Sequence, residues 1–388
     1  MKIQWKRILL ISVSYILVAA VASACTLFLW GAKNNKLAEL ESIIENKFIG
    51  DADMEQARDA AAAAMVDAIG DRWSYYISAE DYAAHLENKN NAFVGVGITI
   101  SRQEEGDGYD ILEVSPGGSA QEGGILPGDL LIEVEGQSTS EMTMEEVKRV
   151  VRGEIGTEVT LTVLRGEEIL SFTLERREIR VEVAKGQMLS GNVGYVKIAN
   201  FNTNCADETI EAVEALLEQG AQGLIFDVRN NPGGYVDEML EVLDYLLPKG
   251  VLYRDLDYLG NEGEERSDAS CLELPMAVLV NEDSYSAAEF FAAAMQEFEW
   301  AAIVGQHTTG KGHYQNTLRL SDGSAVNLST GKYFTPSGKN LTETGGITPD
   351  IVEEVDEETA SLIYSEALEP EKDPQIQAAL SAVVGMVE

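Results

Sequence analysis

The 388-residue chain is poor in the residue types that build disulfide frameworks and zinc sites. It has three cysteines, Cys25, Cys205 and Cys271, and only three histidines. A sparse, odd set of cysteines excludes a disulfide framework. Because Cys25 lies inside an apolar run, at most one bridge, between Cys205 and Cys271, is left open. The sequence has no CxxC motif and no His/Cys cluster, so we expect no metal site.

Basic residues are scarce as well. The chain carries 28 Lys and Arg residues against 66 Asp and Glu residues, which gives a formal net charge of −38. A surface this acidic repels phosphate backbones and anionic lipid headgroups. Nucleic acid is therefore excluded as a partner, and any membrane attachment has to be hydrophobic. The 45% of hydrophobic residues is ordinary for a globular protein and excludes wholesale disorder.

One long uncharged run lies near the N-terminus, at residues 8–30, directly after Lys2, Lys6 and Arg7. A helix of this length spans about 34 Å, enough for a hydrocarbon core of about 30 Å. Small residues at 22–24 resemble a signal-cleavage site, which would give a secreted protein, but the run continues to Trp30. We therefore expect an uncleaved single-pass anchor in the cell membrane. Its basic flank is expected in the cytoplasm and the rest of the chain outside.

The remaining chain divides into three parts, and together they predict an α+β multidomain protein. Residues 31–91 have apolar residues at helical spacing and predict a helical spacer or an arm that forms a homodimer. Residues 92–178 alternate as short strands separated by Gly, Pro and acidic turns. Residues 179–388 alternate strands and helices, which indicates a largely parallel sheet covered by helices. They end in a helix near 374–387.

Three segments that follow strands could hold chemistry. The first, residues 227–234, reads DVRNNPGG; its paired glycines suit either an oxyanion hole or a tight turn. The second, residues 281–289, opens a helix, where Ser284 and Ser286 could each be an N-cap or a nucleophile. The third, residues 305–315, holds Lys311 between two glycines. It does not fit a phosphate loop, because Gly312 stands where Ser or Thr is required.

Taken together, the segments offer a serine nucleophile and a lysine base. A neutral lysine at pH 7 needs its pKa lowered by about 3 units, or about 4–5 kcal/mol. Burial can supply that shift, and the Gly-Lys-Gly sequence has no adjacent acid to oppose it. His307 and His313 flank Lys311, so a Ser-His pair stays open as a local alternative.

The same segments resemble the C-terminal processing peptidases, also called tail-specific proteases. The matching elements are residues 227–234, the SYSAAE element at 284–289, and the GKGHYQ element at 310–315. Residues 330–336 and 345–350 match further family elements. The resemblance implies a ClpP- or crotonase-like α/β peptidase core that requires no cofactor and no metal.

Carried over position by position, the resemblance makes Ser286 the nucleophile, Lys311 the general base and Gln315 the residue that orients Lys311. The backbone N–H groups of Gly233 and Ala287 would form the oxyanion hole. Three neighbouring residues are expected to have supporting roles. Asp227 and Arg229 are expected to brace the oxyanion turn. Glu289 lies at helical spacing from Ser286 and is expected to engage Arg229.

Within the same resemblance, residues 92–178 correspond to a PDZ domain. Gly95, Val96, Gly97 and Ile98 lie where such a domain binds a terminal carboxylate, so these four residues are the predicted substrate-binding loop. A module that only spaces the other domains is the alternative. The sequence also departs from the family pattern, because Tyr285 replaces a small residue between the two serines.

These observations predict a serine endopeptidase that recognises the exposed C-termini of extracytoplasmic proteins through its PDZ domain and cleaves the proteins. The alternative is a catalytically silent membrane-anchored scaffold that only binds C-termini. The complete Ser/Lys/Gln set favours the enzyme. An acyl-CoA enzyme of the related crotonase-like fold is disfavoured by the serine and the lysine.

Overall fold

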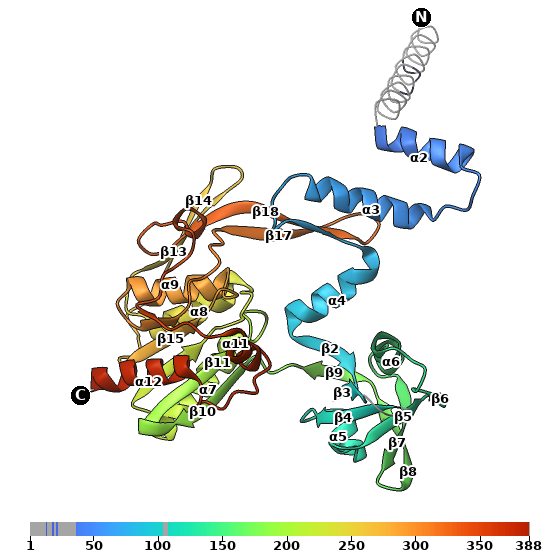
Figure 1. Ribbon diagram of the computed structural model, residues 1–388. Coiled ribbons are helices and arrows are strands. Elements are labelled where there is room, and N and C mark those ends of the chain that lie inside the picture. The colour runs from blue at the N-terminus through green and yellow to red at the C-terminus, as the bar shows by residue number, and fades with distance from the viewer. Residues whose placement is uncertain (1–12, 14–17, 19–20, 22–35, 104–107, 388) are drawn as a thin grey trace, which may run out of the picture. The chain divides into compact units, whose positions relative to one another are not determined.

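The computed structural model describes residues 36–103 and 108–387, together with positions 13, 18 and 21 (Figure 1). The predicted membrane segment 8–30 lies outside the described residues except at those three positions. Among the described residues, no helix is both long and apolar enough to cross a membrane. The chain separates into two compact units, which divide between Ser78 and Ala79.

The described part of the first unit is mainly helical, as the spacing of its apolar residues predicts. It contains α2 (Lys36–Lys47), α3 (Met54–Asp67) and a short strand β1 (Tyr75–Ile77). Asp53 caps α3 by accepting from the Gln56 N–H at 3.0 Å, and Arg58 pairs with Glu41 of α2. Neither helix, as described, has a buried residue. The two helices are therefore linked by charged groups rather than by a shared core.

The second unit begins with α4 (Ala79–Asn90) and the β-rich module. The elements of the module are β2 (Ala92–Gly95), β3 (Ile98–Arg102), β4 (Tyr109–Val114), α5 (Ser119–Gly123), β5 (Leu130–Val134), β6 (Gln137–Ser138), α6 (Met144–Val151), β7 (Glu158–Arg165), β8 (Glu168–Glu175) and β9 (Arg177–Arg180). An antiparallel sheet in the order β3-β4-β5-β7-β8, with β6 on β5, surrounds one core. Strands β2 and β9 pair antiparallel, so the two ends of the module lie together.

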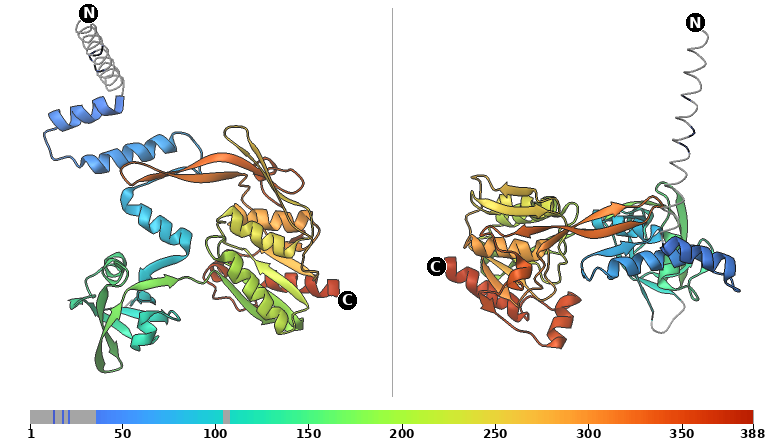
Figure 2. Two further views of the ribbon diagram at one scale, coloured as in Figure 1. Left: turned by 180° about the vertical axis from the view of Figure 1, so that it is seen from behind. Right: turned by 90° about the horizontal axis from the view of Figure 1, so that it is seen from above.

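A six-stranded sheet forms the centre of the remaining part (Figures 1 and 2). Its strands are β10 (Ala184–Leu189), β11 (Val193–Ile198), β12 (Gly223–Asp227), β15 (Met276–Val280), β16 (Ala302–Gly305) and β19 (Ile351–Val352), in this order. Only the β10–β11 pair is antiparallel. Every residue of β12 and β15 is buried, as expected for the continuous apolar runs of a parallel sheet covered on both faces.

Helices cover both faces of this sheet. The first face packs against α7 (Cys205–Glu218), α8 (Val236–Leu246) and α9 (Ala287–Glu297). The opposite face packs against α12 (Pro374–Val387), whose Ile376, Ala379, Leu380 and Val383 share a core with the strands. Figure 2 shows α12, in red, on the opposite side of the sheet from α7, α8 and α9. Short helices α10 (Leu341–Thr344) and α11 (Glu357–Tyr364) and the 3-10 turn η1 (Ser190–Asn192) complete this part.

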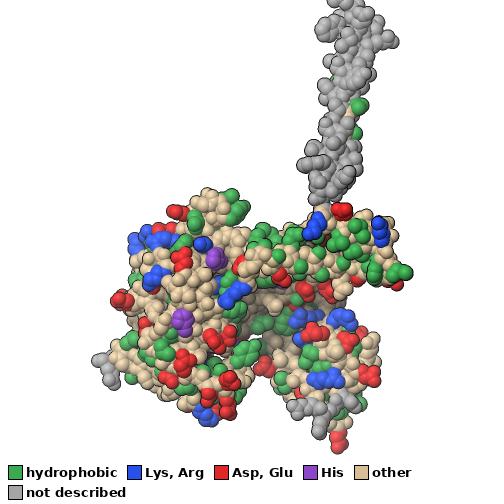
Figure 3. Space-filling model, turned by 45° about the horizontal axis from the view of Figure 1, so that its top comes forward, with side chains coloured by type: hydrophobic (Ala, Val, Ile, Leu, Met, Phe, Trp, Pro, Cys, Tyr) green, Lys and Arg blue, Asp and Glu red, His purple; other side chains and the backbone are tan. Residues whose placement is uncertain are grey.

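A second, antiparallel sheet lies beside α9. It contains β13 (Val251–Asp257), β14 (Glu262–Arg266), β17 (His313–Arg319) and β18 (Ala325–Phe334), with β13 between β14 and β18 and with β17 on β18. The predicted α+β multidomain fold is confirmed in the described part of the chain. On the face shown in Figure 3, acidic side chains are scattered among basic and neutral ones, which suits a role in solubility.

Candidate active site

Ser286 lies in a sharp turn between β15 and α9, as the residue just before the helix. Its backbone has φ 60° and ψ −125°, a region that residues other than glycine rarely occupy. The described structure gives the Ser286 side chain no hydrogen bond to the end of the helix. The N-cap alternative is therefore not supported for Ser286. A strained strand-to-helix turn that presents a hydroxyl is instead the geometry of a nucleophile elbow.

Ser284, the other serine of the motif, has a structural role. Its buried hydroxyl donates to the Val228 carbonyl at 2.7 Å and accepts from the Asn281 N–H at 3.0 Å. These bonds tie the loop after β15 to the loop after β12. Because the Ser284 hydroxyl is used within the fold, Ser286 is the serine available for chemistry.

Lys311 lies in the loop after β16, and only 8% of its surface is exposed. The Lys311 N–H donates to Glu289 Oε2 at 2.9 Å, and the Gly310 N–H donates to Glu289 Oε1 at 2.7 Å. The Thr308 hydroxyl donates to the same carboxylate. Glu289 is itself buried and follows Ser286 by three residues in α9. One helical turn therefore fixes the lysine segment relative to the serine.

The expectation that Glu289 engages Arg229 is wrong. The Glu289 carboxylate is occupied by the lysine loop, and Arg229 finds other partners. Burial raises the pKa of Glu289 above its usual range, although its hydrogen bonds to Thr308 and to the backbone N–H groups of Lys311 and Gly310 act in the opposite direction. Its two carboxylate oxygens are met by three donors, the N–H groups of Gly310 and Lys311 and the Thr308 hydroxyl.

Arg229 and Asp227 form a buried network beneath the glycine turn. Arg229 contacts the Asp227 carboxylate at 2.6 Å and donates to Asp373 at 2.8 Å and to Gln375 at 2.9 Å. Burial opposes ionisation of Asp227, yet the Arg229 and Lys197 cations outweigh it and hold the pKa of this carboxyl well below its usual range. The network fixes Arg229 at the start of the loop that leads to the glycine turn; its bracing of the oxyanion turn stays a prediction.

The partners Asp373 and Gln375 of this network were not identified from the sequence. Asp373 precedes α12 and also caps it, since its Oδ1 accepts from the Gln375 N–H at 2.9 Å. An Asp before a predicted helix that starts with Pro374 is a recognisable N-cap signal. Nothing local, however, points to an arginine 144 positions earlier.

Gly233 and Ala287, the predicted oxyanion donors, lie side by side. Gly233 has φ +86°, and a Cβ placed on it would lie 2.7 Å from both the Ala287 nitrogen and Ser286 Cβ. The structure therefore leaves no room for a side chain at Gly233, and it brings two backbone segments together beside Ser286. The Gly233 N–H donates to Asn231 Oδ1 at 2.8 Å. An oxyanion that bound there would have to replace this side-chain acceptor.

Among the remaining predicted residues, Gln315 lies on β17, the strand after Lys311, whereas His307 and Tyr285 precede Lys311 in the chain. Gln315 of β17 donates from Nε2 to the His313 carbonyl and to Ser329 Oγ, each at 3.0 Å; its role toward Lys311 stays a prediction. His307 Nδ1 lies 2.9 Å from the Thr308 carbonyl oxygen. The Tyr285 ring centroid lies 5.7 Å from Lys311 Nζ, so the residue that departs from the family pattern contacts the candidate base.

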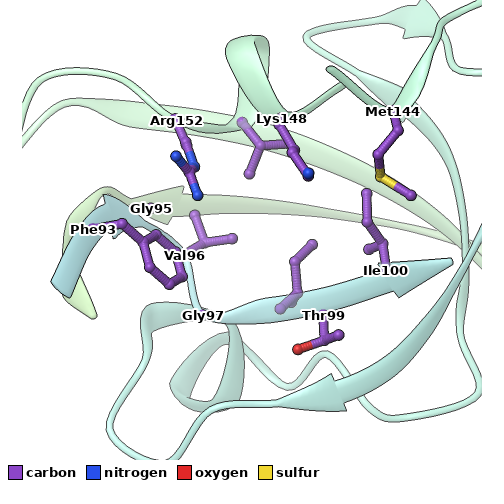
Figure 4. Close-up of a pocket in the computed structure, with 11 residues that line it drawn as sticks. Phe93, Gly95, Val96, Gly97, Thr99, Ile100, Met144, Lys148 and Arg152 are labelled. Atoms are coloured by element: carbon purple, nitrogen blue, oxygen red, sulfur yellow. The ribbon is translucent and has the colours of Figure 1, made fainter. Parts of the chain in front are cut away.

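A groove lies between β3 and α6 in the β-rich module and encloses about 350 Å³ (Figure 4). All four residues of the predicted substrate-binding loop, Gly95, Val96, Gly97 and Ile98, line it. Its other lining residues are Phe93, Thr99, Ile100, Met144, Lys148, Val151 and Arg152. Gly97 has φ +82°, a conformation that glycine adopts without strain. The lining is mainly apolar, which suits an apolar terminal side chain.

Neither cysteine chemistry nor a metal is indicated in the described part of the chain. Cys205 and Cys271 are both free thiols, so the bridge that the sequence left open is not formed. Burial raises the pKa of Cys205 to about 12, which makes it an inert core residue. No group of His, Cys, Asp and Glu among the described residues could hold a metal ion.

The fold and the site together define a serine peptidase with an attached PDZ domain. The model of peptidase family S41 matches residues 192–353, and a PDZ domain model matches residues 111–165. The carboxy-terminal processing protease CtpA of Bacillus subtilis (strain 168) is 31% identical over 381 residues, which cover 93% of this chain and 80% of that protein. The chain belongs to this family of C-terminal processing serine peptidases, as the sequence motifs indicate.

Other relatives agree with this assignment. A Staphylococcus aureus (strain MSSA476) protein named "Probable CtpA-like serine protease" is 30% identical over 328 residues, covering 82% of this chain and 64% of that protein. The chain thus spans a little under two thirds of that relative. A solved structure from Bacteroides fragilis, described as an S41 protease, is 16% identical. It has a TM-score of 0.54 and covers 90% of this chain and 97% of that one. It shows the shared fold.

Proposed function

We propose that the protein is a membrane-anchored Ser-Lys endopeptidase that captures exposed C-termini of extracytoplasmic proteins in its PDZ groove and cleaves the captured chains. One observation carries the catalytic part of this proposal. The Ser286 hydroxyl stands in a strained turn without a capping role, and Glu289, one helical turn away, holds the backbone of the buried Lys311. A silent scaffold has no need of this arrangement, and membership of a serine peptidase family favours the enzyme.

In the proposed reaction, Ser286 Oγ attacks the scissile carbonyl carbon while neutral Lys311 Nζ takes the hydroxyl proton. The negative oxygen of the tetrahedral intermediate accepts from the Gly233 and Ala287 N–H groups. The C–N bond then breaks, and the Lys311 ammonium gives its proton to the leaving amine. Water attacks the resulting ester with Lys311 again taking a proton. That proton returns to Ser286 as the acid product leaves.

The proposed oxyanion hole requires a local exchange of hydrogen bonds. At rest the Gly233 N–H donates to Asn231 Oδ1, so the developing oxyanion replaces a neutral amide oxygen. A charged acceptor makes the stronger hydrogen bond. The exchange therefore favours the transition state over the resting enzyme, which is what a catalytic donor has to do.

The PDZ groove supplies the proposed selectivity. An extended tail would pair with the edge of β3 while its carboxylate meets the N–H groups of the Gly95–Ile98 loop. Retention of the tail raises the effective concentration of upstream segments at Ser286. A peptide with a free apolar C-terminus should therefore be cleaved with a higher kcat/KM than its amidated twin. Equal values for the two peptides would contradict tail recognition.

A fluorophosphonate probe tests the catalytic part of the proposal. We expect one adduct on the full chain, located by peptide mass spectrometry at Ser286 and lost in Ser286→Ala. A Ser284→Ala variant is the matched control, because that hydroxyl is bonded within the fold. Labelling at Ser284, or none on a protein that is folded, would contradict the assignment of Ser286 and support the scaffold.

The membrane part of the proposal rests on residues 8–30 alone. We expect the protein to stay in the membrane pellet after a carbonate wash, and external protease to digest the catalytic part. A mature form that starts near Cys25 and is found in the medium would contradict the anchor and establish a cleaved signal. Dimerisation through residues 31–91 is likewise proposed from the sequence, and analytical ultracentrifugation in detergent tests it.

A further inference from the structure

Tyr333 is a buried tyrosine that the proposed reaction does not use. It lies in β18, with only 3% of its surface exposed. Its ring packs edge-on against Phe290 of α9, with centroids 5.5 Å apart, and lies 6.1 Å from the ring of Tyr253 in β13. Phe290 follows Ser286 by four residues. The phenol is thus fixed between the nucleophile's helix and the second sheet.

The side-chain hydroxyl and the backbone N–H of Tyr333 both donate hydrogen bonds to the lysine loop. The Tyr333 hydroxyl donates to the Lys311 carbonyl, and the Tyr333 N–H donates to the Gly312 carbonyl at 3.2 Å. Glu289 holds the Lys311 N–H from the other side. The peptide groups on both sides of the Lys311 side chain are therefore held by side chains. Such support matters because Lys311 lies between two glycines, which leave the backbone free to turn.

The same phenol lies beside the nucleophile. Burial raises the pKa of Tyr333 well above its ordinary value, and a contact with the Ser286 hydroxyl acts in the opposite direction. The phenol therefore stays protonated at any pH at which the enzyme works. A protonated phenol can donate to the Lys311 carbonyl and still present oxygen lone pairs to the Ser286 hydroxyl.

We propose that Tyr333 is a positioning residue for the Ser-Lys pair, whose hydroxyl fixes the backbone of Lys311 and the resting place of the Ser286 hydroxyl. The inference rests on the proposed Ser-Lys mechanism and adds a third side chain to it. Removal of this one hydroxyl leaves the ring, its aromatic packing and the substrate groove in place. It frees the Lys311 carbonyl, so the Lys311 amine and the Ser286 hydroxyl lose their common support.

The test compares Tyr333→Phe with Tyr253→Phe. Tyr253 is buried and packs in the same cluster, against the rings of Phe290 and Tyr333. Its variant therefore removes a phenol oxygen from that cluster without touching the lysine loop. Peptide cleavage is measured with the full chain, as kcat and KM separately, beside the thermal midpoint. We expect Tyr333→Phe to lower kcat about 10- to 100-fold, the range for a misplacement of about 1 Å, with KM within twofold. Tyr253→Phe should keep kcat within twofold.

Each other outcome overturns the inference. A Tyr333→Phe enzyme with kcat within twofold of the unaltered enzyme would show that the hydroxyl positions nothing. An equal loss in both variants would assign the effect to packing of the aromatic cluster. A rise in KM without a fall in kcat would assign it to substrate binding. Failure of the Ser-Lys mechanism itself is recognised separately, because Lys311→Ala would then keep its activity whatever Tyr333→Phe does.

Discussion

Asp373 joins the C-terminal helix to the glycine turn of the active site, and its removal should be costly. One carboxylate oxygen accepts from Arg229 Nη1 at 2.8 Å, and the other caps α12 by accepting from the Gln375 and Ile376 N–H groups at 2.9 and 3.2 Å. Only 2% of the Asp373 surface is exposed. An Asp373→Ala variant therefore loses a buried ion-pair partner and an N-cap together.

The expected loss of folding free energy in Asp373→Ala follows from these two contacts. Loss of a hydrogen bond to a charged group costs about 1.5–3 kcal/mol, and loss of an N-cap costs about 1 kcal/mol. Arg229 keeps Asp227 and Gln375, so the full cost of stranding a buried charge does not apply. We expect Asp373→Ala to lower the free energy of unfolding by about 3 kcal/mol. Asp373→Asn can still cap the helix and should cost about 1–2 kcal/mol.

Asp356→Ala is the matched control, because Asp356 caps α11 by accepting from the Thr359 N–H at 2.8 Å while its side chain is exposed. It should cost about 1 kcal/mol. Urea unfolding followed by circular dichroism gives the free energies, and amide hydrogen exchange of residues 374–387 reports the release of α12. If Asp373→Ala costs no more than Asp356→Ala, the link between Arg229 and the C-terminal helix contributes nothing, and the reasoning is refuted.

Three further predictions concern the turn and the lysine loop. Asp227 has a depressed pKa in the folded protein, so its contribution to stability is present above the unfolded pKa of about 3.9 and is lost as the pH falls through the folded value. Urea titrations should therefore show that Asp227→Asn loses less stability below pH 4 than the unaltered protein does. The same loss in both proteins would contradict this. Glu289→Gln replaces one of the two accepting oxygens with an NH2 group, which then faces the N–H of either Lys311 or Gly310. We therefore expect kcat to fall about 10- to 100-fold with KM kept, and a fall in substrate affinity alone would argue against a role in the lysine loop. Gly234→Ala would place a Cβ 2.2 Å from the Phe201 carbonyl carbon, so thermal unfolding should show a large loss of stability. Gly385→Ala is the control: Gly385 lies in a helix with open space around it, so this change should be neutral or slightly stabilising.

The elements with strong local signals are predictable from the sequence. Helix α12 has the predicted bounds, because a proline-initiated apolar segment is a local pattern. The cap of α6 is equally local, with Thr143 and Glu146 bonded to each other's backbone N–H groups. The same holds for the motif around Ser286, where a serine and the residues after it open a helix.

Contacts between distant segments are not predictable in this way. The bond between Arg229 and Asp373, and that between Glu289 and the Lys311 loop, depend on which strands become neighbours. The position of Tyr333 depends on the pairing of β18 with β13, a strand that was not predicted from the sequence. The unusual backbone conformation of Ser286 also cannot be predicted from its residue type, because a serine at a helix start is ordinarily an N-cap.

The central claim is that Lys311, and not a histidine, takes the proton of Ser286. The most direct measurement is kcat/KM of the full chain for one peptide with a free apolar C-terminus, compared among Lys311→Ala, His307→Ala and His313→Ala. Loss of a general base costs about 10²–10⁴-fold, so we predict a fall of this size for Lys311→Ala with an unchanged circular dichroism spectrum. Both histidine variants should keep most of the activity. A histidine variant as damaged as Lys311→Ala, with its fold intact, would contradict the Ser-Lys mechanism.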